Sequence, residues 1–214
     1  MTVGNRMSRR LITVSADTAV PEAQALMRRE KIHRLPVLNK DGKLVGIVTA
    51  SDLRRASAPP ATTLDIYELH YLISRLKVES VMTKNPITVR EDLPVEEAAR
   101  IMDDNRVAGL PVISDGELAG IITESDLFRL FIDLFGARHR GVRLTLLMPE
   151  KRGELAAVAA AIASAGGNLL SLVAFDGDDE HTSYCTLKVE GVTKDALVAA
   201  VEPLVERVME AKES

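Results

Sequence analysis

The chain has 214 residues, of which 46% are hydrophobic and 27% charged, and this balance excludes a disordered or fibrous protein. A net charge of -4 and an aromatic content of 3% with no tryptophan provide neither a basic field nor stacking platforms, so we expect no nucleic-acid partner. A single cysteine cannot form a disulfide within the chain. The N-terminus has no apolar signal region, and no apolar run approaches the roughly 20 residues that span a membrane, so we expect a cytoplasmic protein without a membrane partner.

A segment near the N-terminus is repeated later in the chain. With a shift of 75 residues, which becomes 74 after one deletion, residues 7–55 share 22 identities with the second segment. Shared composition would not produce that number, so the sequence contains a duplicated unit. The matches include Ile12-Thr13-Val14 with Ile87-Thr88-Val89, Leu35-Pro36-Val37 with Leu110-Pro111-Val112, and Thr49, Ser51 and Asp52 with Thr123, Ser125 and Asp126.

Each copy predicts a strand, a helix, two strands and a second helix. In the first copy a strand over 12–14 precedes an amphipathic helix with Val20, Ala23, Met27 and Ile32 on its apolar face. Apolar runs over 35–38 and 44–49 flank an Asp-Gly pair, which favours a hairpin. The second helix is predicted to begin at Ser51, with Ser51 as its N-cap and Asp52 in its first turn.

The two copies differ in charge and are separated by a linker. Residues 6–55 carry a charge of +6 and residues 81–129 a charge of -5. Between them, two prolines interrupt the chain and Ile66, Leu69, Ile73 and Leu76 recur at helical spacing. We therefore predict domains over 1–57 and 81–135, joined by a linker with a helix over 58–80.

A different pattern occupies the C-terminal part of the chain. Apolar runs over 142–148, 169–175 and 182–189 predict strands, and residues 154–165 and 194–201 predict helices. The order strand, helix, strand, strand, helix, with room for a last strand, is the ferredoxin-like plan. The predicted fold class is therefore α+β, with this third domain over 141–210.

The motif Gly-hydrophobic-hydrophobic-Thr-x-Ser-Asp occurs in both copies, at 46–52 and 120–126. On this motif, residues 7 to about 130 resemble a tandem pair of CBS domains, a Bateman module, which implies that the two β-α-β-β-α repeats form a pseudo-two-fold module. Residues 141–210 resemble an ACT domain in the loop that carries Glu150 and Gly153 and at Asn168. The order CBS, CBS, ACT is similar to acetoin utilisation proteins, which implies a role in acetoin or related carbon metabolism.

The duplicated motif offers a phosphate and ribose site. Hydroxyl groups and one carboxylate at a helix N-terminus suit a phosphate, and a carboxylate can accept hydrogen bonds from a ribose. Helix capping alone would explain the same residues. The CBS resemblance implies that the Asp holds the ribose, and that the ligand is AMP, ADP, ATP or S-adenosylmethionine.

Basic residues distinguish the two copies at this site. His33 and Arg34 precede Leu35-Pro36 in the first copy, whereas Ala108 and Gly109 precede the matching pair in the second. Unless Arg34 is only a solvated surface charge, the two sites are therefore unequal. The candidate nucleotide-binding residues are Thr13, His33, Arg34, Leu35, Pro36, Thr49, Ser51, Asp52, Thr88, Leu110, Pro111, Thr123, Ser125 and Asp126.

The C-terminal domain has its own candidate residues. The ACT resemblance implies a small-ligand site, for instance for an amino acid, at Glu150, Gly153 and Asn168. The loop departs from the family pattern, because Glu150 replaces the usual Asp and Arg152 the usual Pro. We therefore favour a domain that forms a homodimer, since a partner readily covers an edge strand of a small sheet.

The sequence provides little support for catalysis. It has no phosphate loop, no nucleophile elbow, no dinucleotide fingerprint and no zinc-protease motif, so we expect no catalytic residue and no metal site. The predicted function is a non-enzymatic regulator that senses an adenine nucleotide, with an unidentified protein target. Two alternatives stay open, a ligand-free interaction scaffold and an amino-acid-responsive regulator.

Overall fold

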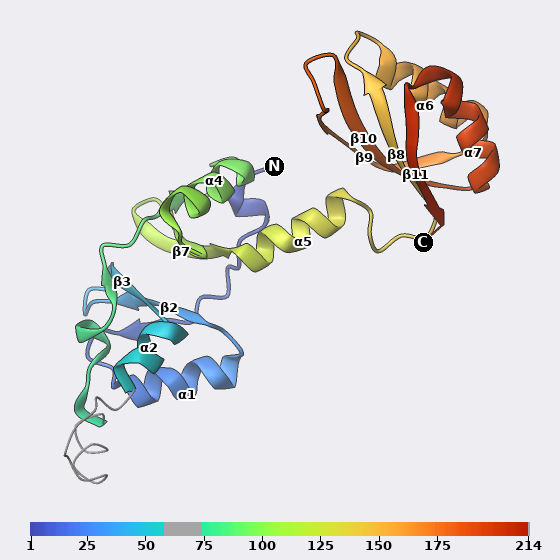
Figure 1. Cartoon of the computed structure of the whole chain (residues 1–214). Coiled ribbons are helices and arrows are strands. Elements are labelled where there is room, and N and C mark those ends of the chain that lie inside the picture. Colours follow the sequence, from blue (N-terminus) through green and yellow to red (C-terminus); the bar gives the residue numbers. More distant parts are fainter. Residues whose placement is uncertain (58–73, 214) are drawn as a thin grey trace. The chain divides into compact units, whose positions relative to one another are not determined.

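The computed structural model describes residues 1–57 and 74–213 (Figure 1). The chain divides into two compact units, Met1–Leu127 and Phe128–Ser214. Most of the predicted linker over 58–80, with Ile66, Leu69 and Ile73 of its helix, lies outside the described residues. The domain boundaries expected from the sequence stay predictions.

The first copy contains the predicted order of elements. These are β1 (Val14–Ser15), α1 (Val20–Glu30), β2 (Arg34–Leu38), β3 (Leu44–Thr49) and α2 (Ala50–Ser57). The first strand begins two residues later than predicted, because only Val14 and Ser15 pair with β2. Ile32 is wrongly placed on the helix face: Lys31 adopts a left-handed conformation with φ of 56° and ends α1.

The second copy repeats this order. Its elements are β5 (Val89–Arg90), α4 (Val95–Asn105), β6 (Gly109–Ser114), β7 (Glu117–Thr123) and α5 (Glu124–Leu134). Arg106 ends α4 with φ of 53°, as Lys31 ends α1. In both copies the first strand pairs in parallel with the second, and the second pairs antiparallel with the third. The β-α-β-β-α prediction is therefore confirmed for both copies.

An aliphatic core holds each copy together. In the first copy, α1 contributes Val20, Ala23 and Met27, which recur on one face of the helix, and they pack with Leu35 of β2 and Leu53 of α2. Leu35 and Leu53 have no exposed surface. Figure 1 shows α1 and α2 side by side next to the sheet. This packing fixes the start of α2 relative to β2 and β3.

The two copies exchange their first segments. The 3₁₀ helix η2 (Val78–Ser80) buries Val78 in the core of the first copy, and β4 (Thr83–Lys84) pairs with β3. Conversely, η1 (Val3–Asn5) bonds to the second copy through the Val3 N–H and the Leu93 carbonyl at 2.8 Å. Each copy therefore contains a segment that the boundaries 1–57 and 81–135 assign to the other.

Methionine and glycine make the closest contacts in this exchange. A Cβ atom on Gly46 of β3 would overlap the sulfur of Met82, and one on Gly120 of β7 would overlap the sulfur of Met7. The exchanged segments therefore lie directly on the glycine positions of the two repeated motifs. Met7 and Met82 thus each pack on the sheet of the opposite copy.

The C-terminal unit forms one four-stranded antiparallel sheet. Its elements are β8 (Val142–Pro149), α6 (Glu154–Ser164), β9 (Asn168–Asp176), β10 (Thr182–Glu190), α7 (Lys194–Val201) and β11 (Arg207–Glu213). The strand order is β11-β8-β10-β9, which is the ferredoxin-like arrangement. The last strand, for which the sequence left room, follows the 3₁₀ helix η3 (Glu202–Leu204) that contains Pro203. The ACT resemblance of this unit stays a prediction.

Alternate residues of β8 and β10 build the core beneath α6 and α7. Leu144 and Leu146 of β8 and Leu187 of β10 are fully buried there with Ile162 of α6. Cys185 belongs to the same core, and burial raises its thiol pKa to about 11. The thiol is therefore protonated at neutral pH, and Cys185 serves as a small hydrophobic residue.

Within the described part of the chain, no helix is both long and apolar enough to cross a membrane.

Candidate functional site

The start of α2 is held by a reciprocal pair of hydrogen bonds. Oδ2 of Asp52 accepts from the Thr49 backbone N–H at 2.9 Å and from its hydroxyl at 2.6 Å, while Thr49 Oγ1 accepts from the Asp52 N–H at 3.2 Å. This is a capping box, in which Thr49 is the N-cap and Asp52 the third helical residue. The prediction of Ser51 as the N-cap is therefore wrong, because Ser51 lies inside the helix and is exposed.

The second copy uses the same cap. Oδ2 of Asp126 accepts from the Thr123 N–H at 2.9 Å and from its hydroxyl at 2.7 Å. Asp126 is only 9% exposed, and Ser125 is exposed. The Thr and Asp of both motifs therefore have a structural role at each helix start, and the Ser is left at the surface.

A cleft of about 560 Å³ opens at the capped end of α2. It brings together six of the predicted residues from both copies, namely His33, Arg34, Thr49, Ser51, Asp52 and Leu110. The volume is within the usual range for small-ligand sites, and the helix N-terminus favours an anion. The cleft can therefore accept a phosphorylated small molecule next to a carboxylate.

The other predicted residues lie outside the lining of this cleft. Leu35 is fully buried in the core and is not among the residues that line the cleft. Pro36 and Pro111 are also buried, whereas Thr88 is exposed and Thr13 half-buried. Thr123, Ser125 and Asp126 belong to the start of α5. The Leu-Pro pairs of the repeat therefore shape the sheet rather than the cleft surface, apart from Leu110.

Arg34 belongs to the first copy, but its side chain extends onto the second copy, which the sequence did not predict. Its side chain lies across Gly109, its own counterpart in the second copy, and a Cβ there would overlap Nη1. Burial lowers the pKa of the Arg34 guanidinium, and Glu124 and Asp126 partly offset this effect. Nη1 is buried without a hydrogen-bond partner among the described residues. Arg34 therefore crosses from the first copy toward the acidic start of α5.

Asp52 is less available to a ligand than the sequence suggests. Oδ2 is used by the cap, and Oδ1 accepts from Nη2 of Arg55 at 2.9 Å. The Arg55 side chain is 76% exposed, so the ion pair is weak and a ribose hydroxyl can replace it. The spacing of three residues on one helix could have revealed this pair.

Several lining residues were missed by sequence reasoning. Arg54 of α2 and Arg106 at the end of α4 add positive charge, and Thr83, Asn85 and Ile87 come from the segment before β5. Arg106 occupies the position of Lys31 in the repeat, so a comparison of the two copies could have identified Arg106 as a candidate. No local pattern identifies 83–87, because this segment reaches the cleft only through the exchange between copies.

The candidate residues of the C-terminal unit do not form one site. Glu150 directly follows Pro149, the last residue of β8, which pairs with Thr182 at one end of β10. Asn168 pairs with Glu190 at the other end of β10. A strand of nine residues separates the two ends by roughly 26 Å. Asn168 donates to Glu190 at 2.7 Å, and Gly153 caps α6 with φ of 92°. Asn168 is therefore a strand-end residue.

Residues 1–57 and 74–213 contain no cluster of three or more His, Cys, Asp or Glu side chains that could hold a metal ion.

Solved structures resemble the N-terminal part of the chain. The CBS domain pair of protein MJ0100, in complex with 5'-methylthioadenosine and S-adenosyl-L-methionine, is 31% identical with a TM-score of 0.51, over 61% of this chain and 99% of that chain. CBSX2 in complex with AMP is 34% identical with a TM-score of 0.50, over 61% and 96%. A Vibrio cholerae protein assigned to acetoin utilization (AcuB) is 27% identical with a TM-score of 0.53, over 64% and 95%.

Sequence relatives lead to the same family. A CBS domain-containing protein of Dictyostelium discoideum is 40% identical over 127 residues, which cover 59% of this chain and 88% of the relative. An L-aspartate semialdehyde sulfurtransferase of Methanocaldococcus jannaschii is 33% identical, but the match covers only 22% of that enzyme. The CBS domain model matches residues 3–59 and 78–133. The chain therefore belongs to the CBS domain family and contains a tandem CBS pair, the Bateman module.

Proposed function

We propose that this protein is a non-enzymatic regulator whose CBS pair binds an adenosyl ligand in the cleft at the start of α2. The observation that carries the proposal is the cleft itself, which joins Asp52 and a helix N-terminus of one copy to Leu110 of the other. Related CBS pairs bind AMP or S-adenosyl-L-methionine, which supports a ligand of this class. The ribose would bind near Asp52, and an anionic group near Ser51.

The regulated target is a protein of acetoin or related carbon metabolism in this proposal. Its support is the likeness to the Vibrio cholerae protein, whose chain matches over 95% of its length. Within an enzyme such as the sulfurtransferase the matching module is a minor part, so a CBS pair can act beside a separate catalytic domain. The present chain would act on its target by binding it.

A thermal-shift assay tests ligand binding. At a hundredfold excess over the dissociation constant, AMP, ATP or S-adenosylmethionine should stabilise the protein by about 2.7 kcal/mol, because a ligand of the folded state alone adds that free energy. The melting temperature should rise by several degrees. The Asp52→Ala/Asp126→Ala variant should lose the shift, measured against its own ligand-free melting temperature, since each change also removes a cap.

Two further variants separate the cap from the ligand contact. Asp52→Asn keeps an oxygen that can accept from the Thr49 N–H but removes the charge, so it should retain most of the stability and lose ligand affinity. Asp103→Ala removes an exposed carboxylate of α4 and should change neither. A double variant with the full ligand shift would refute the proposed site, and a wild-type protein without any shift would leave the interaction scaffold as the better function.

We also propose that the C-terminal unit pairs with a second copy of the chain through β9. In the sheet order, β9 and β11 are the two edges. Charged residues of β11, among them Arg207 and Lys212, protect its edge, whereas residues 169–175 of β9 are uncharged and contain no proline. Ala174 and Phe175 are exposed on this bare strand. A matching β9 of the partner would complete its hydrogen bonds.

Light scattering at micromolar concentration tests the dimer. The chain mass is 23.3 kDa, and we expect twice that value for the wild type. Ala174→Lys should shift the mass toward the monomer, because a lysine on an edge strand opposes pairing. Lys212→Ala on the other edge is the matched control. A wild-type mass of one chain would contradict the dimer.

A further inference from the structure

The repeat places the framework of a second site at the start of α5. Gly109 of the second copy lines the cleft at Asp52 of the first. In the repeat, Asp126 corresponds to Asp52, and Arg34 corresponds to Gly109. Each copy also receives an exchanged segment from the other. The framework is therefore present twice, but the opposite copy contributes a glycine to one site and an arginine to the other.

The Arg34 side chain fills the space that the glycine leaves open in the first site. It lies across Gly109, so that a Cβ built there would overlap Nη1 and lie 3.1 Å from Cδ and from Cζ. Gly109 pairs with Thr123, the N-cap of α5, and the guanidinium therefore reaches the start of that helix. Glu124 and Asp126 of α5 attract it electrostatically. Arg34 thus lies where the corresponding cleft at α2 has room for a ligand.

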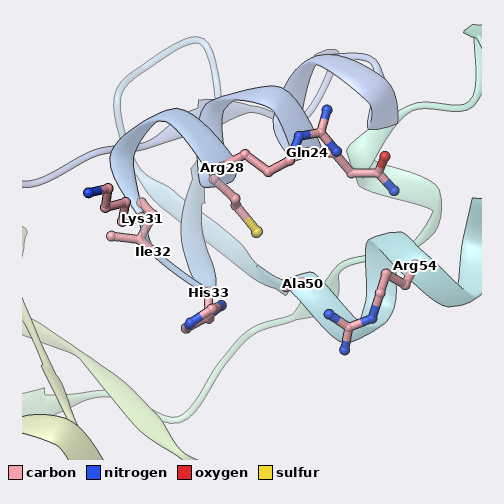
Figure 2. Close-up of a pocket in the computed structure, with 8 residues that line it drawn as sticks. Gln24, Arg28, Lys31, Ile32, His33, Ala50 and Arg54 are labelled. Carbon is pink, nitrogen blue, oxygen red and sulfur yellow. The ribbon is translucent and has the colours of Figure 1, made fainter.

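The start of α5 is also more acidic than the start of α2. Glu124 is the first residue of α5, and its counterpart in α2 is Ala50. Figure 2 shows Ala50 at the start of α2, where it also lines another pocket with His33 and Arg54. Two carboxylates at one helix start oppose a phosphorylated ligand and attract a guanidinium. The charge at α5 therefore favours the arginine over an anionic ligand.

Burial distinguishes the two sites as well. Asp126 is 9% exposed, whereas Asp52 is half-buried. Nη1 of Arg34 is buried and has no hydrogen-bond partner among residues 1–57 and 74–213. A buried nitrogen without a partner stabilises a fold poorly, so the fold alone does not explain the position of this side chain. Closure of the space at α5 does explain it.

We propose that Arg34 closes the site at Asp126, so that the CBS pair binds one adenosyl ligand, in the cleft at Asp52, rather than two. The inference rests on the proposed function and specifies its stoichiometry. Arg34 and Gly109 occupy equivalent positions of the repeat. This difference, together with the additional carboxylate of Glu124, decides which of the two repeated motifs takes a ligand.

Isothermal titration calorimetry of the full chain with AMP, and in parallel with S-adenosylmethionine, counts the sites. We expect one ligand per wild-type chain. The Arg34→Ala/Glu124→Ala variant removes the obstructing side chain and the extra charge, so it should bind two. Arg34 also lines the cleft at Asp52, and the readout is therefore the number of ligands rather than the affinity. Adding Asp126→Asn should return the number to one, while its amide oxygen can still accept from the Thr123 N–H.

Arg29→Gln is the matched control, because Arg29 is an exposed arginine of the first copy that pairs with Glu30 and does not line the cleft. It should keep one site. Thermal unfolding without ligand identifies the variants that are folded. Two ligands on the wild type, or only one on the folded Arg34→Ala/Glu124→Ala variant, would overturn closure by Arg34 and leave the proposed function intact. Absence of binding of both ligands to the wild type would overturn the proposed function, and the inference with it.

Discussion

Leu35→Ala should lower the free energy of unfolding of the N-terminal unit by about 2–5 kcal/mol. Leu35 has no exposed surface and packs with Val20 and Leu53, so the change leaves a cavity among groups that cannot close it. Chemical denaturation of the ligand-free protein measures the loss. The effect is expected without any nucleotide, because Leu35 is a core residue that does not line the cleft at Asp52.

A volume-conserving change separates packing from ligand contact at the same position. Leu35→Met should cost less than about 1.5 kcal/mol and leave nucleotide binding unchanged. Leu155→Ala removes a leucine that is 43% exposed, so the free energy of unfolding should change by at most about 0.5 kcal/mol. If Leu35→Ala also fell within that small range, Leu35 would not be a core residue.

Gly46→Val should destabilise the N-terminal unit by about 1–3 kcal/mol or more. A Cβ at this position would overlap the sulfur of Met82 and lie 3.0 Å from the Thr83 carbonyl oxygen. The added side chain would therefore push β4 away from β3 and break the exchange between copies. Thermal unfolding followed by circular dichroism measures the loss.

The control for this substitution is a glycine without neighbours. Gly116 lies in the hairpin of the second copy with φ of 82°, and nothing lies within 4 Å of a Cβ built there. Gly116→Asn should cost less than Gly46→Val, since asparagine tolerates the left-handed region. Equal losses for both substitutions would contradict a close contact between Gly46 and Met82.

The order of elements could be predicted because local patterns determine it. The Asp41-Gly42 turn, with φ of 77° at Gly42, marks the first hairpin, and the spacing of Val20, Ala23 and Met27 marks α1. In the C-terminal unit, the apolar runs fall within one residue of β8, β9 and β10. These signals depend on neighbours in the sequence, so they can be read without the fold.

The errors arise where distant residues decide the structure. No local pattern shows that Met82 contacts Gly46 and Met7 contacts Gly120, because only non-local pairing brings each methionine to the opposite copy. Thr49 replaces Ser51 as the N-cap because the strand β3 ends there and the carboxylate of Asp52 folds back onto it. The Arg34 side chain lies across Gly109, which is distant from it in the sequence, so no local pattern predicts this contact.

The candidate site is predicted in part for the same reason. The repeated Thr-x-Ser-Asp motif locates the start of α2, and His33 and Arg34 are brought to the same cleft by the β2–β3 pairing. Asn168 and Glu150 follow a family pattern in the sequence, yet antiparallel pairing sends them to opposite ends of the sheet. A motif therefore gives residue types, and the topology decides which of them meet.

Hydrogen–deuterium exchange of the full chain, with and without saturating AMP, tests most directly whether an adenosyl ligand binds in the cleft at Asp52. The ligand would cover the start of α2 and the end of α4, which border this cleft. We expect slower exchange at residues 49–54 and 106–110, because bound ligand suppresses local opening there. Unchanged exchange in both segments, or protection confined to residues 142–213, would contradict it.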